Sequence, residues 1–153
     1  MTNLREIQQF LTPKKIAVAG ASRNSKKFGG TIFQELKARG FELSPVNQNA
    51  EEIQGVPCYQ SVQDLPPEIK HLYIVTPRKS TDSVVNDAIS RGMDMIWIQQ
   101  KSETPEAIKA IKEAGIPLIH NKCIMMFADP VKGPHKFHRF LAKVFGSYPK
   151  NNG

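Results

Sequence analysis

The hydrophobic residues of this chain form continuous runs separated by segments with helical spacing. Three apolar runs, at positions 16–19, 72–75 and 95–98, contain no charged side chain. A strand with one solvent-facing side would alternate between apolar and polar residues, whereas a parallel strand covered by helices on both faces is apolar throughout. The pattern therefore predicts buried parallel strands at these three places.

Three further segments have apolar positions at helical spacing, and each ends at a glycine. They cover positions 31–39, 81–91 and 105–114. Glycine suits the residue that follows a helix, because a left-handed backbone is free of strain without a Cβ. After each glycine comes an apolar segment, at 41–46, 93–98 and 116–119. We therefore expect helices that lead directly into strands.

Strands and helices that alternate with short connections form a parallel sheet with right-handed crossovers. We predict a Rossmann-type, doubly wound α/β fold in three layers, with a mainly parallel sheet of roughly five to six strands. Positions 55–59 are expected to add a short edge strand, where Pro57 is tolerated. Residues 134–145 are expected to form a closing helix.

The length of 153 residues suffices for one domain with a substantial core. We predict a single domain over residues 1–146 and a flexible tail over 147–153. Residues 1–11 mix charged and apolar side chains, which is typical of a short amphipathic helix rather than a signal peptide. Cys58 and Cys123 form neither a metal-type pair nor a disulfide framework. A cytoplasmic protein without membrane contact is therefore expected.

A formal net charge of +7 favours an anionic partner. The basic residues are interleaved with acids along the chain, and there is no arginine-rich arm or aromatic RNA-binding signature. We therefore expect a small anionic ligand rather than nucleic acid. A solvated basic surface without a ligand is the alternative at this point.

The segment 20–30, which links the first predicted strand to a helix, has the composition of a phosphate-binding loop. It begins at Gly20, offers the Ser22 hydroxyl and carries three basic side chains, Arg23, Lys26 and Lys27. Helix amino termini hold free N–H groups and partial positive charge, so phosphate binds there readily. A side chain at Gly20 is expected to fill the ligand's volume. An ordinary strand-to-helix turn is the alternative interpretation.

This loop departs from both common nucleotide-binding motifs. Ser22 and Ser25 occupy the later glycine positions of the dinucleotide fingerprint, and the Gly-Lys-Ser/Thr of a P-loop is absent. Val46 is followed by Asn47 and Gln48 instead of the acid that holds the ribose hydroxyls of NAD. An NAD(P)-dependent oxidoreductase with an atypical loop is thus the second hypothesis.

Other polar segments also follow predicted strands. Arg78 and Lys79 come after the 72–75 strand and either reach a phosphate or belong to a surface turn. Gln99 and Gln100 follow the tryptophan strand, and residues 120–123 follow the last strand. Since ligands of such sheets bind beyond the carboxyl ends of the strands, we expect all of these segments to face one crevice.

Several short motifs occur in the order Ala19-Gly20-Ala21-Ser22, Pro45-Val46-Asn47, 53–59, Trp97-Ile98-Gln99 and Cys123. In this order the chain resembles the small stand-alone CoA-binding domain family, which is similar to the amino-terminal domain of the succinyl-CoA synthetase alpha subunit. The resemblance covers residues 14–126. It implies coenzyme A or an acyl-CoA as the ligand.

The resemblance also implies which residues bind this ligand. The phosphates would contact the first loop, the nucleotide would be flanked by two further loops, and the pantetheine arm would pass the end of the tryptophan strand. The residues that would contact the phosphates are Gly20, Ala21, Ser22, Arg23, Lys26, Lys27, Phe28 and Gly29. Those that would flank the nucleotide are Asn47, Gln48, Thr76 and Pro77, with Arg78 and Lys79 beside them. Those that would line the path of the pantetheine arm are Ile98, Gln99 and Gln100.

Catalytic residues are not evident in the sequence. The phosphohistidine of the synthetase lies in a domain that this chain is too short to contain, so the resemblance assigns no role to His120. Cys123 is either a buried small residue or a thiol near the crevice, and His135 with His138 lacks a third metal ligand. We predict a CoA-binding protein without catalysis, with an unidentified protein partner left open. A protein-interaction domain with a vestigial pocket is the third hypothesis.

Overall fold

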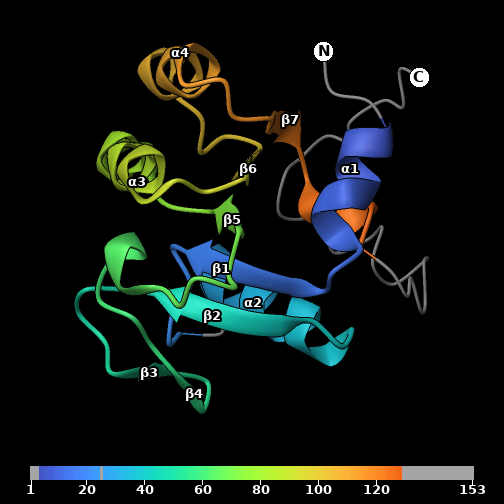
Figure 1. Cartoon of the computed structure of the whole chain (residues 1–153). Coiled ribbons are helices and arrows are strands. Elements are labelled where there is room, and N and C mark those ends of the chain that lie inside the picture. The colour runs from blue at the N-terminus through green and yellow to red at the C-terminus, as the bar shows by residue number, and fades with distance from the viewer. Residues whose placement is uncertain (1–3, 25, 129–153) are drawn as a thin grey trace.

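The computed structural model describes residues 4–24 and 26–128, shown in Figure 1. Its α-helices are α1 (Leu4–Leu11), α2 (Phe28–Ala38), α3 (Arg78–Arg91) and α4 (Pro105–Glu113), and Val62–Asp64 and Ile124–Met126 form short 3-10 helices. Its strands are β1 (Lys15–Ala19), β2 (Glu42–Val46), β3 (Glu52–Ile53), β4 (Val56–Pro57), β5 (His71–Ile74), β6 (Met95–Gln99) and β7 (Leu118–Lys122).

Five of these strands form one parallel sheet in the order β2-β1-β5-β6-β7. The chain runs from β1 outward to β2 and then returns to the other side of β1, where β5 pairs with it. The strand order thus reverses between β1 and β5. In open parallel sheets the ligand crevice lies beyond the carboxyl ends of the strands at this reversal.

Helices cover both faces of the sheet, so the molecule has three layers (Figure 1). On one face α1 and α2 pack against Trp97 and Tyr73, and the ring of Phe10 meets Trp97 edge-on at 5.4 Å. On the other face α3 and α4 pack against Leu72, Ile96 and their neighbours. The predicted doubly wound, mainly parallel α/β fold is confirmed.

The sequence patterns that predicted these elements act as expected at several helix ends. Gly92 ends α3 with a left-handed φ of 80°, which a residue without Cβ adopts freely. Thr104 caps α4 by accepting a hydrogen bond from the N–H of Ala107, and Pro105 occupies the first helical position. The continuous apolar run of β6 is buried along its whole length.

Three predicted boundaries were wrong. The helices predicted to begin at residues 31 and 81 begin three residues earlier, at Phe28 and Arg78. The strand predicted at 116–119 instead covers Leu118–Lys122, so His120, Asn121 and Lys122 lie in the strand rather than after it. Polar residues are accommodated there because β7 is an edge strand with one neighbour.

The edge strand predicted at 55–59 is only partly present. Val56–Pro57 pairs antiparallel with β3 in a two-stranded hairpin, while Tyr59 makes a single parallel bridge to Val46. The tight turn of this hairpin, at Gln54 and Gly55, has positive φ angles of 51° and 81°. The hairpin also contacts α2, since the Gln54 amide donates to the carbonyl of Gly30 at 2.8 Å.

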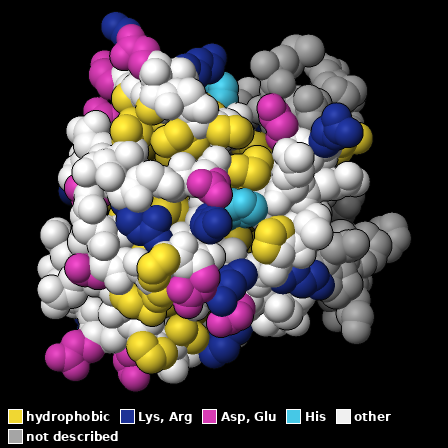
Figure 2. Space-filling model, in the orientation of Figure 1, with side chains coloured by type: hydrophobic (Ala, Val, Ile, Leu, Met, Phe, Trp, Pro, Cys, Tyr) yellow, Lys and Arg dark blue, Asp and Glu magenta, His cyan; other side chains and the backbone are white. Residues whose placement is uncertain are grey.

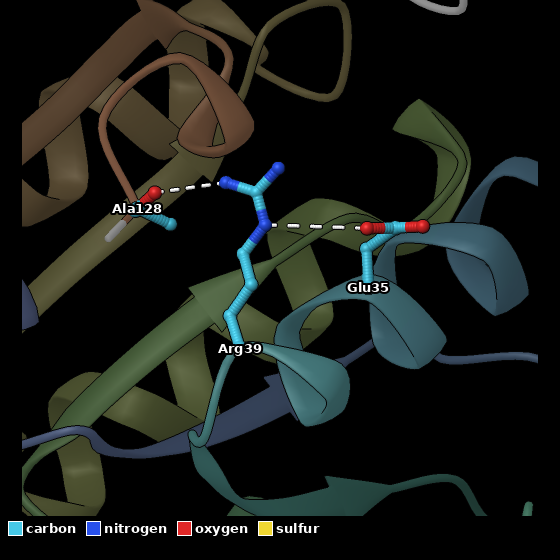
Figure 3. Close-up of polar contacts among 3 residues, drawn as sticks. All are labelled: Glu35, Arg39 and Ala128. Atoms are coloured by element: carbon cyan, nitrogen blue, oxygen red, sulfur yellow. Dashed lines mark hydrogen bonds and ion pairs between the residues drawn. The ribbon is translucent and has the colours of Figure 1, made fainter. Parts of the chain in front are cut away.

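A buried arginine joins α2 to the end of the described chain (Figure 3). Arg39 Nη1 donates to the carbonyl of Ala128 at 2.8 Å, and its Nε lies 4.0 Å from a Glu35 carboxylate oxygen one helical turn earlier. Arg39 is only 7% exposed. This contact attaches the segment after β7 to the face of the sheet that α1 and α2 cover.

The predicted helix at 134–145, with His135 and His138, and the predicted tail at 147–153 lie outside the described residues. Within residues 4–24 and 26–128, no helix combines the length and apolar character needed to cross a membrane. The same residues contain no group of three or more His, Cys, Asp or Glu side chains that could hold a metal ion. Basic and acidic side chains are interspersed on the face that Figure 2 shows.

Candidate functional site

The backbones after β1 and β5 meet at the reversal of strand order. A Cβ placed on Gly20 would lie 2.6 Å from the N of Thr76 and 2.7 Å from the carbonyl oxygen of Val75. Gly20 also has a φ of +102°, a left-handed conformation that L side chains rarely adopt. The two loops are therefore in direct contact at this point.

This geometry corrects the expected direction of a side chain at Gly20. The missing side chain would point into the backbone of Val75 and Thr76, directly after β5, not into a volume left for a ligand. Gly29 and Gly30 act in the same way, because a Cβ on them would lie 2.3 Å from the Gly20 carbonyl oxygen and 2.2 Å from that of Asn24. The glycines thus allow the loop and the first turn of α2 to pack on each other.

Short-range hydrogen bonds shape the loop after β1. The Ser22 Oγ accepts from the N–H of Asn24 at 3.1 Å, and the Asn24 side chain accepts from the N–H of Lys26 at 2.9 Å. Because Oγ is the acceptor in the first bond, the Ser22 hydroxyl keeps its own hydrogen for another acceptor. Arg23, Lys26 and Lys27 are exposed. The loop presents a hydroxyl and three cations to solvent.

Basic residues stand at the amino termini of both helices that flank the strand reversal. Lys27 is the N-cap of α2, and Arg78 and Lys79 open α3, whose N-cap is Pro77. Neither helix has an acid in its first turn, whereas α1 and α4 each have one. Cations are unfavourable next to the positive end of a helix dipole. The two helix starts together make a strongly positive edge.

The loop after β2 also reaches this edge. Asn47 Nδ2 donates to the carbonyl of Ala21 at 3.4 Å, and Asn47 Oδ1 accepts from the N–H of Asn49 at 2.8 Å. Gln48, between them, is exposed. The structure therefore brings the predicted Asn47–Gln48 turn beside the loop after β1.

The loop after β6, residues 100–104, lies beyond β5 on the other side of the strand reversal, and we call it the second wall. Its Ser102 carbonyl accepts from the hydroxyl of Thr81 at 2.7 Å, and the Glu103 carbonyl accepts from Arg78 Nε at 3.0 Å. The Glu103 carboxylate accepts from the backbone N–H groups of Lys101 and Asn121 at 3.2 and 3.3 Å. A cavity of about 640 Å³ lies beside this wall, lined by Arg78, Lys101, Glu103, Thr104, Pro105 and Ile108.

The three residues predicted to line the pantetheine arm have unequal access. Ile98 and Gln99 are fully buried, and Ile98 packs in the core beneath α3 and α4. Gln99 Oε1 accepts from the Tyr73 hydroxyl at 2.7 Å and from the N–H of Ile124 at 3.1 Å. Among the described residues, Gln99 Nε2 and Gln100 Oε1 are the buried side-chain polar atoms without a hydrogen-bond partner.

Burial shifts the pKa of three titratable groups near this edge, two thiols and one imidazole, toward their uncharged forms. Burial raises the pKa of the Cys123 thiol, and the Gln99 amide beside it partly opposes this shift. Burial also raises the pKa of the Cys58 thiol and lowers the pKa of His120, in spite of the Glu103 carboxylate near that imidazole. Both thiols are therefore protonated at neutral pH.

Sequence reasoning missed three residues of the second wall, Thr81, Ser102 and Glu103. Their contacts join positions 18 to 25 residues apart in the chain. A threonine inside a helix and a serine in a loop carry no signal of such a contact. Only the predicted convergence of strand ends could have indicated that these positions are neighbours.

Relatives of this chain include parts of much larger proteins. It is 31% identical over 129 residues to the alpha subunit of an ADP-forming acetate–CoA ligase II of Pyrococcus furiosus, a match that covers 77% of this chain. The chain spans only 12–28% of the length of this and three related archaeal ligases. It also matches the uncharacterized protein YneT of Bacillus subtilis at 26% identity, over 78% of this chain and 89% of that protein.

Solved structures share the fold along most of the chain. A hypothetical protein from Pyrococcus horikoshii OT3 is 33% identical, with a TM-score of 0.75 over 82% of this chain and 89% of its own. A second structure, described as PH1109 protein redesigned for binding, is 28% identical, with a TM-score of 0.74 over 98% of this chain and 97% of its own.

The family comparison agrees with the resemblance in the sequence motifs. The model of one family matches residues 14–129. The match begins one residue before β1 and includes Ala128, whose carbonyl accepts from Arg39. The description of that family is "CoA binding domain". This chain belongs to the CoA-binding domain family.

Proposed function

We propose that this protein binds coenzyme A or an acyl-CoA at the carboxyl edge of its sheet, and that it acts by binding rather than by catalysis. The observation that carries the proposal is the pair of basic helix starts at the strand reversal. Cations at these positions weaken the isolated helices, and an anion between them removes that penalty.

The proposed phosphate contacts come from the first loop. The Ser22 hydroxyl has a hydrogen to donate, and Arg23, Lys26 and Lys27 are exposed around it. Ligand phosphates placed here would also accept hydrogen bonds from the free backbone N–H groups in the first turn of α2. This is the role that the residue types suggested, with Gly20 and Gly29 allowing the close packing of the loop and offering the ligand only backbone groups.

The remaining contacts would hold the nucleotide and the pantetheine arm. Asn47 and Gln48 lie on one side of the first loop, and Thr76 and Pro77 lie on the other. The buried Gln100 Oε1 lacks a donor, and the two amides of a pantetheine arm carry N–H groups that suit it. We propose that a pantetheine N–H supplies the donor that Gln100 Oε1 lacks.

A thermal-shift panel with CoA, acetyl-CoA, NAD, NADP and ATP tests this proposal. A ligand bound only by the folded state adds about 2.7 kcal/mol at a hundredfold excess over Kd, which raises Tm by about 5 to 10 °C for a chain of this size. We expect this shift with CoA or acetyl-CoA. A shift with NAD or NADP alone would indicate the oxidoreductase alternative, and no shift with any of them would indicate a protein-interaction domain.

A further inference from the structure

Two threonine hydroxyls and the backbone carbonyl of a serine, all in buried residues, connect the two loops that follow β5 and β6. Thr76, in the loop after β5, is 7% exposed, Thr81 on α3 is fully buried, and Ser102 in the loop after β6 is 6% exposed. The Thr76 and Thr81 hydroxyl oxygens lie 2.7 Å apart, and the Thr81 hydroxyl lies 2.7 Å from the Ser102 carbonyl oxygen. We call this chain of contacts the Thr76–Thr81–Ser102 relay.

The direction of each hydrogen bond in the relay follows from counting protons. A threonine hydroxyl has one hydrogen, and the carbonyl oxygen of Ser102 can only accept. Thr81 therefore donates to Ser102, with the Pro77 carbonyl at 3.3 Å as a weaker acceptor, and its lone pair accepts from Thr76. The Thr76 hydrogen is consequently used within the relay and is not available to a phosphate oxygen.

The first turn of α3 touches the same wall at two more points. Arg78 Nε donates to the carbonyl of Glu103 at 3.0 Å, and Asp82 accepts a hydrogen bond from the hydroxyl of Thr104. Thr81 lies between these two residues in sequence and is the one that is fully buried. It is also the one that extends the connection to the loop after β5, through Thr76.

We propose that Thr81 is the positioning residue of the ligand site, holding the loops after β5 and β6 and the basic start of α3 in one fixed arrangement. Because it is buried, it acts through Thr76 and Ser102 and does not touch the ligand. A crevice fixed in advance loses less conformational entropy when it binds, so its affinity is higher. This inference rests on the proposed CoA site and adds to it the residue that sets its geometry.

The test compares three variants with the parent protein in calorimetric titrations with CoA. Thr81→Val replaces the hydroxyl by a methyl group of similar size, and Thr81→Ser keeps the hydroxyl. Val85→Ala is the matched control, since Val85 is fully buried one turn further along α3 and takes no part in the relay. We expect Thr81→Val to lose at least about tenfold in affinity, as for one lost hydrogen bond of about 1.4 kcal/mol. Thr81→Ser and Val85→Ala should stay within about threefold of the parent.

A second measurement needs no ligand. Hydrogen exchange at the Ser102 amide, which donates to the Gln99 carbonyl at 2.9 Å, reports opening of the β6 loop. Relative to the amide of Ile74 in β5, exchange at Ser102 should accelerate in Thr81→Val and not in Val85→Ala. Unchanged exchange, or a Thr81→Val affinity equal to that of the parent, would overturn the inference. If the parent itself fails to bind CoA, the proposed function is wrong, and the exchange measurement alone then decides the role of Thr81.

Discussion

The two loops that form the walls of the candidate site are built in opposite ways. The loop after β1, residues 20–27, is shaped mainly by contacts among its own residues and the adjoining turn of α2, with further contacts from Asn47 and the Val75–Thr76 backbone, and its charged side chains are exposed. The loop after β6, residues 100–104, is held by two side chains of α3, Arg78 and Thr81, and by a backbone N–H of β7 that donates to the Glu103 carboxylate. The first supplies charge and the second supplies a fixed shape.

This difference separates two contributions to binding. Exposed cations act through a field that salt screens over about 8 Å at physiological ionic strength. Buried hydrogen bonds between uncharged groups are insensitive to salt, and their loss leaves unsatisfied polar atoms inside the protein. Variants of the two loops should therefore differ in how salt changes their effect.

The largest effect is expected from adding a methyl group beneath the first loop. Gly29→Ala places a Cβ 2.3 Å from the Gly20 carbonyl oxygen, so the loop and α2 must move apart. We expect the free energy of unfolding, measured in urea, to fall by about 3 kcal/mol. CoA binding should be lost with it.

Gly40→Ala is the control for this substitution. Gly40 has a φ of +89° but no atom within 4 Å of an added Cβ, so only backbone strain is introduced. A cost of about 1 to 2 kcal/mol is expected there. Equal stability of Gly29→Ala and the parent would show that the close packing of this loop is not needed.

Removing the charges of the first loop should come next in size. The triple variant Arg23→Ala, Lys26→Ala and Lys27→Ala should weaken CoA binding by about tenfold to a hundredfold at low salt. The parent's affinity should fall with rising salt and that of the variant should change much less, which titrations at two ionic strengths will measure. Lys109→Ala with Lys112→Ala, on α4, is the control and should be nearly neutral. A triple variant with the parent's salt dependence would contradict the assignment.

A variant of the second wall should act on stability and not on salt dependence. Thr104→Ala removes the oxygen that accepts from the N–H of Ala107 and the hydroxyl that donates to Asp82. We expect a loss of about 1 to 2 kcal/mol in urea unfolding. Thr104→Ser, which keeps both bonds, should recover most of it. The salt slope of CoA binding should equal that of the parent, and a changed slope would break the division between the two loops.

The smallest effect concerns acid. Burial lowers the pKa of His120 in the folded protein below its usual value of 6.5, so the unfolded chain takes up this proton more readily. The stability contributed by neutral His120 is complete above about pH 6.5 and is lost as the pH falls through the lower folded pKa. His120→Gln should therefore flatten the change in urea midpoint between pH 7.5 and pH 5.5. An unchanged pH dependence would assign the acid sensitivity to other groups.

Local signals were sufficient for much of the fold. The apolar runs located β1, β5 and β6, and the glycines at 40, 92 and 115 marked the ends of three helices. These features depend on the residue itself and its immediate neighbours. They were read correctly because burial on both faces and a left-handed backbone each restrict residue type strongly.

Features set by distant parts of the chain were misread or missed. Thr81 has the residue type of an N-cap, which favours a helix start there, but its hydroxyl bonds Ser102 and the helix begins at Arg78. Phe28 begins α2 ahead of two glycines, which are poor helix formers and are accepted because the loop packs against them. The space open to a side chain at Gly20 is set by the backbone of Val75 and Thr76, more than fifty residues later.

The basic starts of α2 and α3 also bear on how fast a ligand arrives. Field lines from like charges gathered at the edge of a crevice attract an oppositely charged molecule before any contact forms, and such steering raises association rates by about 10 to 1,000 times. Lys27, Arg78 and Lys79 are exposed and so act on a multiply charged anion while it is still in solution. Capture by this edge would therefore be rapid at low ionic strength, while the time a ligand stays would depend on the buried wall opposite.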